Sequence, residues 1–210
     1  MLPEPNIAVI LLAAGQSRRM GQSNKLLEPV EETSMIRHCA LEAIASRAHS
    51  LHVVLGYQAE AITAELNDLR LNTVSCERWA LGISQSIASG IASAEPNKPD
   101  AFIIMLGDMP FVTAGLLDAL MAKFSEVGAP SIIAASFDGQ IGNPVLWARA
   151  YAPELLCLES DRGGRQLFEK HAADLHRVEA GSAACFDVDD LWALEAARKR
   201  VANPISHFIP

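Results

Sequence analysis

The sequence predicts an α/β fold in which a doubly wound, mostly parallel β-sheet carries helices on both faces. One observation is that short, almost continuous apolar runs, such as residues 7–12 (IAVILL) and 101–106 (AFIIML), alternate with segments of helical period. Strands buried on both faces of a parallel sheet have this composition, whereas strands with one solvated face alternate apolar and polar residues. A second observation is that the 210 residues contain no internal repeat, low-complexity tract or Pro/Ser-rich linker, which favours a single domain.

The individual elements follow from local patterns. Apolar or β-branched runs predict strands at 7–12, 51–55, 72–75, 101–106, 131–136, 143–147, 175–178 and 184–187. Segments of helical period predict helices at 34–46, 58–69, the second half of 79–94, 113–127, 149–158, 164–172 and 189–202. Thr113 is expected to cap the fourth helix, because threonine is a favoured N-cap residue. Trp147 and Trp192 lie on apolar segments and are expected in the core.

Composition excludes several classes of protein. The formal net charge is -8, which argues against a general nucleic-acid binder because such proteins need a basic surface. No apolar run approaches the ~20 residues that span a bilayer, and the N-terminal MLPEPN lacks the basic and apolar regions of a signal peptide. We therefore expect a cytoplasmic protein that does not bind a membrane. The cysteines lack C-x-x-C spacing, so buried thiols are expected at Cys39, Cys76, Cys157 and Cys185.

A loop of small and cationic residues follows the first predicted strand, within residues 11–25 (LLAAGQSRRMGQSNK). Alanine and glycine leave room for a ligand to approach the backbone amides. Arginine can hold a phosphate with two N–H groups, and lysine binds it as a point charge. The loop therefore suits a polyphosphate, although it matches neither G-x-G-x-x-G nor the Walker pattern. A plain surface loop is the alternative.

Two acidic segments also follow predicted strands. Asp108, in IIMLGDMPFV, stands at the carboxyl end of the strand at 101–106, where ligands bind in doubly wound folds. Mg²⁺ takes one or two carboxylates and completes its shell with water and substrate phosphates, so Asp108 is either a metal ligand or a helix cap. In CFDVDDL, Asp187 or Asp189 can join Asp108 on a metal, while Asp189 or Asp190 can be an N-cap.

The motifs together resemble those of the MobA-like nucleotidyltransferases, in the glycosyltransferase-A-like superfamily. The opening LLAAGQSRRMG…NKLL resembles the signature loop of that family. GDMP at 107–110, GNPVL at 142–146, DRGGR at 161–165 and DVD at 187–189 follow in the family's order. Within the family, the pair Ala13-Ala14 before Gly15 resembles the loop of the molybdenum cofactor cytidylyltransferases. The corresponding loop of the guanylyltransferases more often reads Ala-Gly-Gly. The closing motif departs from the usual pattern because it lacks Thr-Pro-Glu after DVD, which leaves open whether Asp187 or Asp189 reaches the metal.

The resemblance implies transfer of CMP from CTP to molybdopterin (Mo-molybdopterin), with release of pyrophosphate and formation of the molybdopterin cytosine dinucleotide cofactor. A molybdoenzyme of the xanthine dehydrogenase type, or its chaperone, is then an expected partner. The alternatives are guanylyl transfer to the same cofactor, nucleotidyl transfer to another phosphorylated acceptor, and a non-catalytic chaperone that binds a nucleotide or cofactor. The absent G-x-G-x-x-G argues against an NAD-dependent oxidoreductase.

The resemblance also implies roles for particular residues. As catalytic residues, Arg19 would hold the β- and γ-phosphates, Lys25 the α-phosphate, and Asp108 the Mg²⁺, with Mn²⁺ as the alternative metal. The expected nucleotide-binding residues are Leu12, Ala13, Ala14, Gly15, Ser17, Arg19, Lys25, Gly82, Ser86 and Gly107. The expected acceptor-binding residues are Gly142, Asn143, Pro144, Arg162 and Arg165, and the metal ligands Asp108 with Asp187 or Asp189. Residues 1–110 would form the nucleotide-binding half of the domain and 111–210 the acceptor-binding half.

Overall fold

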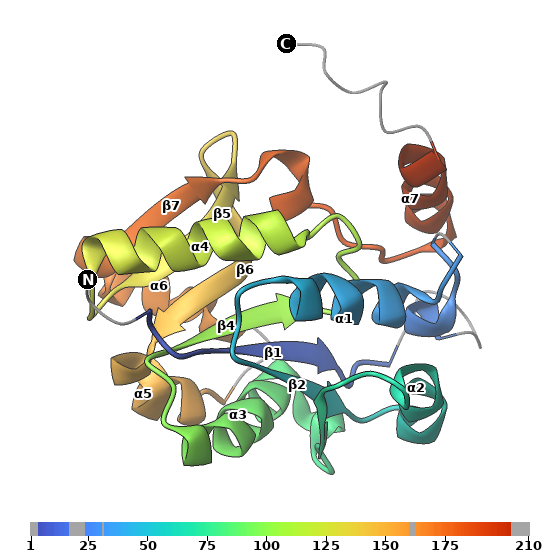
Figure 1. Cartoon of the computed structure of the whole chain (residues 1–210), viewed down its shortest axis with the longest axis horizontal. Coiled ribbons are helices and arrows are strands. Elements are labelled where there is room, and N and C mark those ends of the chain that lie inside the picture. Colours follow the sequence, from blue (N-terminus) through green and yellow to red (C-terminus); the bar gives the residue numbers. More distant parts are fainter. Residues whose placement is uncertain (1–3, 17–23, 31, 160–162, 203–210) are drawn as a thin grey trace.

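The computed structural model describes residues 4–16, 24–30, 32–159 and 163–202, with the backbone alone at 201 and 202. A seven-stranded sheet with strand order β3-β2-β1-β4-β6-β5-β7 forms its centre (Figure 1). The strands are β1 (Ile7–Ala13), β2 (Ser50–Leu55), β3 (Asn72–Ser75), β4 (Ala101–Leu106), β5 (Ile132–Phe137), β6 (Gln140–Ala148) and β7 (Leu175–Glu179). The α-helices are α1 (Met35–Ala45), α2 (Ala59–Leu66), α3 (Ile83–Ala94), α4 (Ala114–Val127), α5 (Ala152–Leu156), α6 (Leu167–Lys170) and α7 (Leu191–Ala202).

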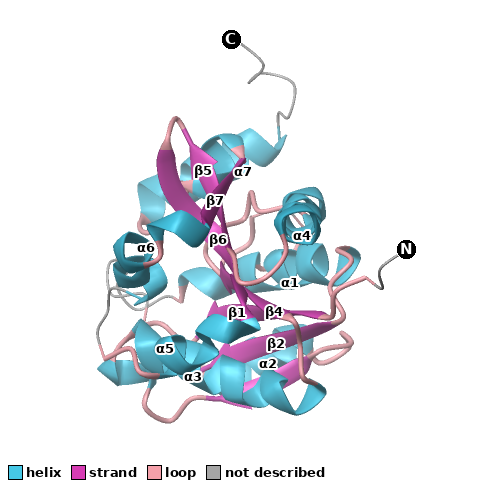
Figure 2. Cartoon of the chain, turned by 90° about the vertical axis from the view of Figure 1, so that its left-hand side faces the viewer, coloured by secondary structure: helices cyan, strands magenta, loops and turns pink. Residues whose placement is uncertain are grey.

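The sheet is mixed but mostly parallel. Strands β3, β2, β1 and β4 pair in parallel, as does β5 with β7, whereas β6 runs antiparallel to both β4 and β5. Helices α1 and α4 cover one face, and α3 and α5 cover the other (Figure 2). The predicted doubly wound α/β class is therefore confirmed.

Close packing of α3 on β1 depends on a glycine. A Cβ atom at Gly90 would overlap the side chain of Ile10, which is itself fully buried in the middle of β1. Since interiors are packed as densely as organic crystals, α3 could not keep this distance from the sheet with a larger residue. The approach of α3 matters for function because its first turn, beginning at Ile83, lies beside the site described below.

Several local predictions are confirmed. The Thr113 side chain accepts a hydrogen bond from the Leu116 amide at 3.3 Å and so caps α4. Asp190 is the N-cap of α7, since its Oδ1 accepts from the Ala193 amide at 2.8 Å. Trp147 is buried, as expected.

Other expectations are wrong. Residues 184–187 do not form a strand, because a 3₁₀ helix covers Gly181–Ala184 and the chain is irregular from there to α7. Trp192 is 78% exposed on the first turn of α7 rather than in the core. Of the four cysteines, Cys157 and Cys185 are exposed.

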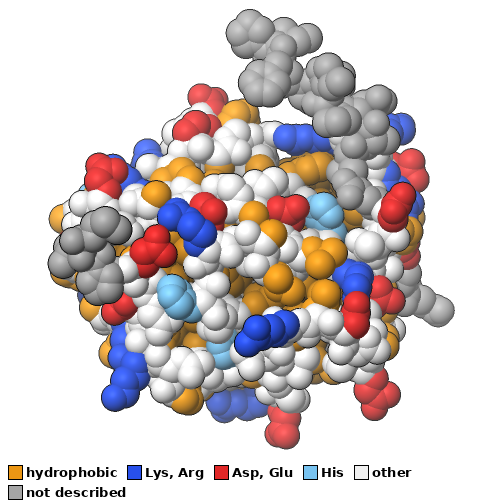
Figure 3. Space-filling view, viewed as in Figure 1, with side chains coloured by type: hydrophobic (Ala, Val, Ile, Leu, Met, Phe, Trp, Pro, Cys, Tyr) orange, Lys and Arg blue, Asp and Glu red, His pale blue; other side chains and the backbone are white. Residues whose placement is uncertain are grey.

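Two surface properties bear on function. Charged side chains of both signs are scattered over the face that carries α1 and α4, without a basic patch (Figure 3). Among the described residues, every helix is too short or too polar to cross a bilayer.

Candidate active site

The site lies where the two central strands end. β1 and β4 are parallel neighbours in which Leu12 pairs with Leu106, so both strands end at the same edge of the sheet. The Gly107 amide continues the ladder by donating to the Leu12 carbonyl at 3.0 Å. A Cβ atom at Gly107 would lie 3.0 Å from that same carbonyl oxygen and from the Ile36 side chain. Glycine therefore lets the backbone turn tightly here and places Asp108 beside the start of the predicted phosphate-binding loop.

A lysine and two carboxylates meet at this edge. Lys25 Nζ lies 2.7 Å from Asp108 Oδ2 and 3.1 Å from Asp189 Oδ1, although 164 residues separate Lys25 from Asp189. Asn24 orients the lysine, because its side chain accepts a hydrogen bond from the Leu26 amide and starts the 3₁₀ turn Lys25–Leu27. The Val188 amide donates to the Asp108 carbonyl at 2.9 Å and fixes the acidic segment against β4.

The structure separates the two carboxylates that the sequence leaves equivalent. Asp189 forms an ion pair with Lys25, whereas Asp187 lines the larger cavity described below and feels the charges of Asp189, Asp108 and Lys25. The irregular chain at 185–190 explains why alternation along a strand could not assign them. Asp189 therefore shares the Lys25 ammonium with Asp108.

The charged groups of the cluster shift one another's pKa values. Burial disfavours the Lys25 ammonium, but Asp108 and Asp189 outweigh this effect and raise the pKa of Lys25. Partial burial, together with the negative charges of Asp189 and Asp108, raises the pKa of Asp187. Lys25 is thus held in its charged form, as a phosphate ligand must be.

A cavity of about 340 Å³ opens at the cluster. Of the predicted nucleotide-binding residues, it is lined by Leu12, Ala14, Gly15, Lys25, Gly82 and Ser86, with Asp108 beside them. Ala13 and Gly107 are buried and are not among the residues that line this cavity. Ser17 and Arg19 lie outside the described residues.

Trp79 is a lining residue that was not among the predicted nucleotide-binding residues. It is half-buried and also lines the smaller cavity. A Cβ atom at Gly56 would lie 2.5 Å from the Trp79 ring and 2.7 Å from the Ala14 carbonyl, so this glycine lets the indole pack against the loop after β1.

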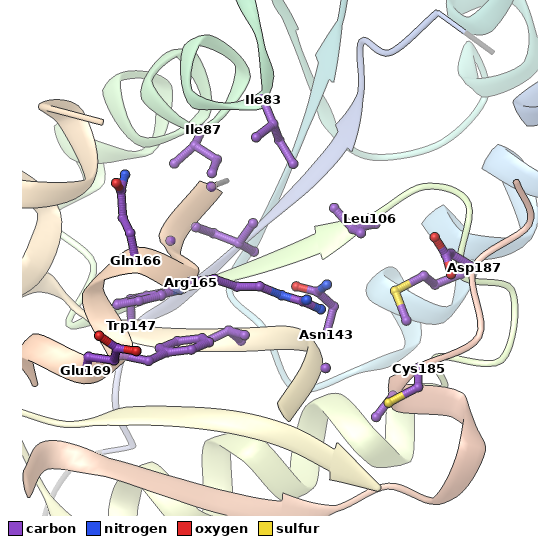
Figure 4. Close-up of a pocket in the computed structure, with 18 residues that line it drawn as sticks. Ile83, Ile87, Leu106, Asn143, Trp147, Arg165, Gln166, Glu169, Cys185 and Asp187 are labelled. Carbon is purple, nitrogen blue, oxygen red and sulfur yellow. The ribbon is translucent and has the colours of Figure 1, made fainter. Parts of the chain in front are cut away.

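A larger cavity of about 680 Å³ adjoins the first, and Ile83 and Leu106 line both. Of the predicted acceptor-binding residues, Gly142, Asn143 and Arg165 line it, Pro144 is buried in β6, and Arg162 lies outside the described residues. The Arg165 side chain extends across the cavity towards Asn143 (Figure 4).

Aromatic residues form one wall of the larger cavity. Trp147 and Phe168 stack with ring centroids 5.5 Å apart and an interplanar angle of 10°. Gly164 makes room for them, since a Cβ atom there would lie 2.5 Å from the Trp147 ring. Glu169 and Cys185 also line this cavity, and no motif in the sequence pointed to either of them.

The cluster fits a divalent cation. Asp108 Oδ1 is buried and has no hydrogen-bond partner among the described residues, which leaves a carboxylate oxygen for a ligand. No group of three His, Cys, Asp or Glu side chains in the described ranges is arranged as a metal site. Mg²⁺ does not need one, because it is usually bound by one or two carboxylates together with water and substrate phosphates.

The fold is that of nucleotidyltransferases of the glycosyltransferase-A-like class. The chain belongs to the MobA-like NTP transferase family, since the model of the MobA-like NTP transferase domain matches residues 9–175. The purine catabolism protein PucB of Bacillus subtilis (strain 168) is 30% identical over 200 residues, which cover 91% of each protein.

Solved structures agree in fold. The homologue of Mycobacterium tuberculosis Rv0371c from Mycobacterium sp. strain JC1 has a TM-score of 0.81 at 25% identity, covering 94% of this chain and 98% of that one. Rv0371c of Mycobacterium tuberculosis H37Rv in complex with manganese has a TM-score of 0.77 at 23% identity, covering 92% and 98%. The resemblance that the motifs predict, to the MobA-like family, is confirmed.

Proposed function

We propose that the chain transfers CMP from CTP to molybdopterin (Mo-molybdopterin), releasing pyrophosphate and forming the cytosine dinucleotide cofactor. The observation that carries this proposal is that Lys25 and Asp108 line the smaller cavity, which adjoins a larger cavity that Asp187 lines. A reaction between two bulky substrates needs such a layout, because donor and acceptor must meet in line at one phosphorus atom.

The smaller cavity would bind the nucleotide. Ala14 and Gly15 offer backbone amides to the base and sugar, and Lys25 would hold the α-phosphate. Arg19, from the cationic loop, would hold the β- and γ-phosphates and steady the leaving pyrophosphate. These groups stabilise charge that develops during transfer, which is the main task of a protein in phosphoryl chemistry.

Asp108 and Asp189 would hold Mg²⁺, with Mn²⁺ as the alternative. The bound cation would neutralise charge on the phosphates during transfer. The unpartnered Oδ1 of Asp108 and the proximity of Asp189 support this assignment. The manganese complex of Rv0371c gives further support from the same fold.

The larger cavity would bind the acceptor through its phosphate and ring system. Arg165 and Asn143 offer donors to a phosphate, with Arg162 as a further candidate from the same motif. Pro144 would shape the backbone of β6 behind them. A phosphate monoester is already anionic at neutral pH, so no general base is required.

The choice of CTP and molybdopterin rests on two further observations. Ala13 and Ala14 resemble the cytidylyltransferase form of the opening loop. The relative PucB is named for purine catabolism, and xanthine, the substrate of the enzyme type expected to receive this cofactor, is a purine. Residues 1–110 would serve the nucleotide and 111–210 the acceptor, with the acceptor cavity bounded by both.

Pyrophosphate release measured with each of CTP, GTP, ATP and UTP, with Mg²⁺ and molybdopterin, tests the proposal. We expect release with CTP that depends on the acceptor. Release with GTP alone would move the protein to guanylyl transfer, and CTP-dependent release only with another phosphorylated acceptor would replace molybdopterin. Calorimetric nucleotide binding without any turnover would favour the non-catalytic chaperone.

A further inference from the structure

One wall of the larger cavity is a stack of aromatic rings that ends at Phe168. The Trp147 ring lies nearly parallel to the Phe168 ring, with centroids 5.5 Å apart, and the Tyr151 ring packs edge-on against Trp147 at 6.1 Å. At the far end of the stack the Tyr151 hydroxyl donates to Asp174 at 2.7 Å. Trp147 is buried, whereas Phe168 is only partly buried and lines the cavity. The fold therefore fixes the plane of the Phe168 ring before a ligand binds.

This wall fits a ligand with a flat ring. Trp147 covers one face of Phe168, so a ligand in the cavity can stack only on the opposite face. The two rings meet at an interplanar angle of 10°, and a stacked ligand would continue the same parallel arrangement. Every planar heterocycle has a π-face, so stacking selects a shape and not a particular ring. A cavity of about 680 Å³ is large enough for a bicyclic ring together with a phosphate.

Glu169 adds a chemical preference to this shape. It follows Phe168 on α6 and lines the same cavity. Figure 4 shows Glu169 on the side of the cavity where Trp147 lies, away from Asn143, towards which Arg165 extends. An ionised carboxylate accepts hydrogen bonds, donates none and repels a phosphate. The Glu169 side of the cavity therefore suits N–H donors, and the Arg165 side suits the phosphate.

We propose that Phe168 and Glu169 select a pterin ring in the acceptor. The ring stacks on Phe168 and donates to the Glu169 carboxylate from its amino group and from the adjacent ring N–H. These two donors lie side by side, as the two oxygens of a carboxylate require. Arg165 and Glu169 then bind opposite ends of one molecule and fix its direction in the cavity. This inference rests on the acceptor site of the proposed function but not on CTP as the donor.

The test is binding of pterin itself to the full chain without nucleotide, followed by quenching of the pterin fluorescence. Lumazine is the comparison ligand, because an oxo group replaces the amino group in it and so replaces donors by an acceptor. We expect the wild type to bind pterin more tightly than lumazine by on the order of tenfold, since a site that hydrogen-bonds an N–H group rejects an analogue without it. Equal affinities, or no pterin binding, would overturn the inference.

Glu169→Gln tests the carboxylate while keeping the shape of the side chain. The variant should lose most of the preference for pterin over lumazine. Glu60→Gln is the matched control and should keep that preference, because Glu60 is exposed on α2 and lines neither of the described cavities. An unchanged preference in Glu169→Gln would contradict the role of this residue.

Phe168→Leu tests the stack. Loss of the π-face should weaken binding of pterin and of lumazine alike, by on the order of tenfold, because both rings stack. Phe137→Leu should bind both ligands as the wild type does, since Phe137 is 42% exposed at the end of β5 and lines neither described cavity. Wild-type affinity for both ligands in Phe168→Leu would show that the ring is not a stacking platform.

These measurements are independent of turnover. The wild-type comparison of pterin with lumazine needs no variant and decides the question if Phe168→Leu does not fold. A chain that selects pterin but does not turn over CTP would contradict the proposed function and keep this inference. A chain that turns over CTP without selecting pterin would contradict this inference alone.

Discussion

The two carboxylate oxygens of Asp108 have different surroundings. Oδ2 accepts from Lys25, while Oδ1 is buried without a partner among the described residues. A buried oxygen of this kind costs stability unless a ligand satisfies it. An unpartnered oxygen at the end of β4 fits the proposed role of Asp108 as a metal ligand.

Asp108→Asn should therefore lower the rate of pyrophosphate release by about 100-fold or more, as removal of a single preorganised electrostatic group does in other enzymes. Circular dichroism should show an unchanged fold, since the amide is nearly isosteric. Asp138→Asn is the matched control, because Asp138 lies exposed in the β5–β6 turn and asparagine tolerates its φ of 48°. Retained activity in Asp108→Asn would remove this residue from the metal site.

Asp187 and Asp189 offer a matched pair of substitutions two residues apart. Asp189→Asn should weaken Mn²⁺ binding in the presence of nucleotide, because Asp189 shares Lys25 with Asp108. Asp187→Asn should keep Mn²⁺ binding and change the KM for the acceptor, since Asp187 lines the larger cavity. Electron paramagnetic resonance and steady-state kinetics report the two effects. Equal loss of Mn²⁺ affinity in both variants would contradict the assignment.

At the scale of the element, Gly142 determines where the acidic segment lies. A Cβ atom at this position would overlap the Ala184 carbonyl, so the start of β6 and the end of the Gly181–Ala184 turn touch backbone to backbone. Asp187 and Asp189 follow within five residues. Gly142 thus acts on the site by permitting this contact as well as by lining a cavity.

Gly142→Ala should destabilise the fold by about 1–3 kcal/mol, the usual cost of overpacking, and weaken Mn²⁺ binding in the presence of nucleotide. Thermal unfolding and metal binding measure the two effects. Gly115→Ala is the control, because the nearest atom to its added Cβ is Thr113 Oγ1 at 3.8 Å. A Gly142→Ala variant with wild-type Mn²⁺ affinity would show that the acidic segment does not depend on this contact.

Arg37 of α1 forms hydrogen bonds with the end of α2, a set of contacts that we call the Arg37 clamp, and its carboxylate partner titrates at low pH. The Arg37 guanidinium donates to the Glu65 carbonyl at 2.7 Å and to both oxygens of Asp68 at 2.6 and 2.7 Å. These hydrogen bonds lower the pKa of Asp68 to about 2 from 3.8. Because the folded pKa is depressed, the stabilisation is complete above the unfolded value and is lost as pH falls from 3.8 towards 2.

Carboxyl NMR titration should find Asp68 titrating near 2, and nearer 3.8 in Arg37→Met. The variant should melt below the wild type at pH 7, by a margin that narrows as the solution is acidified through this window. Identical Asp68 titration in the two proteins would show that the clamp does not form in solution.

Local sequence patterns predicted most of the helices and strands but did not predict the β5–β6 hairpin. Its turn is Asp138–Gly139, with φ of 48° and 75°, and Asp-Gly between two apolar runs is a strong hairpin signal. The prediction of a mostly parallel sheet assigned no direction to β6, which runs antiparallel to both of its neighbours. The strand predicted at 184–187 is wrong for another reason. Contacts of Ala184 with Gly142 and of Val188 with Asp108 fix this segment, and no local sequence pattern encodes such long-range contacts.

At the scale of the site, the sequence named residues at both cavities but could not rank Asp187 against Asp189. That ranking depends on how an irregular segment crosses the end of β4, fixed by a hydrogen bond between residues 80 positions apart in the chain, Val188 and Asp108. Cavity walls such as Phe168 and Glu169 were missed for the same reason, since they become neighbours of Asn143 only in the folded chain.

At the scale of the whole molecule, one continuous sheet joins residues 1–110 to the strands that follow them. β4 pairs with β1 on one edge and with β6 on the other, so no boundary between sheets divides the chain. The contact of Lys25 with Asp189 adds a second connection between distant parts of the sequence. The molecule should therefore unfold as a unit.

Calorimetry of the full chain should show one endotherm, with equal calorimetric and van't Hoff enthalpies. Lys25→Met should shift that endotherm without splitting it, because the sheet remains continuous. Two resolved transitions, one of them sensitive to nucleotide, would instead indicate that the two halves are separate domains.

β6 runs against both of its neighbours, so its first residues rather than its last arrive at the edge where β1 and β4 end. Gly142 and Asn143 thus reach this edge from a hairpin that contributes no residue to the described lining of the smaller cavity. If the larger cavity binds the acceptor as proposed, substitutions in this hairpin would change which acceptor is used and leave the nucleotide site intact. The two specificities could then be altered separately.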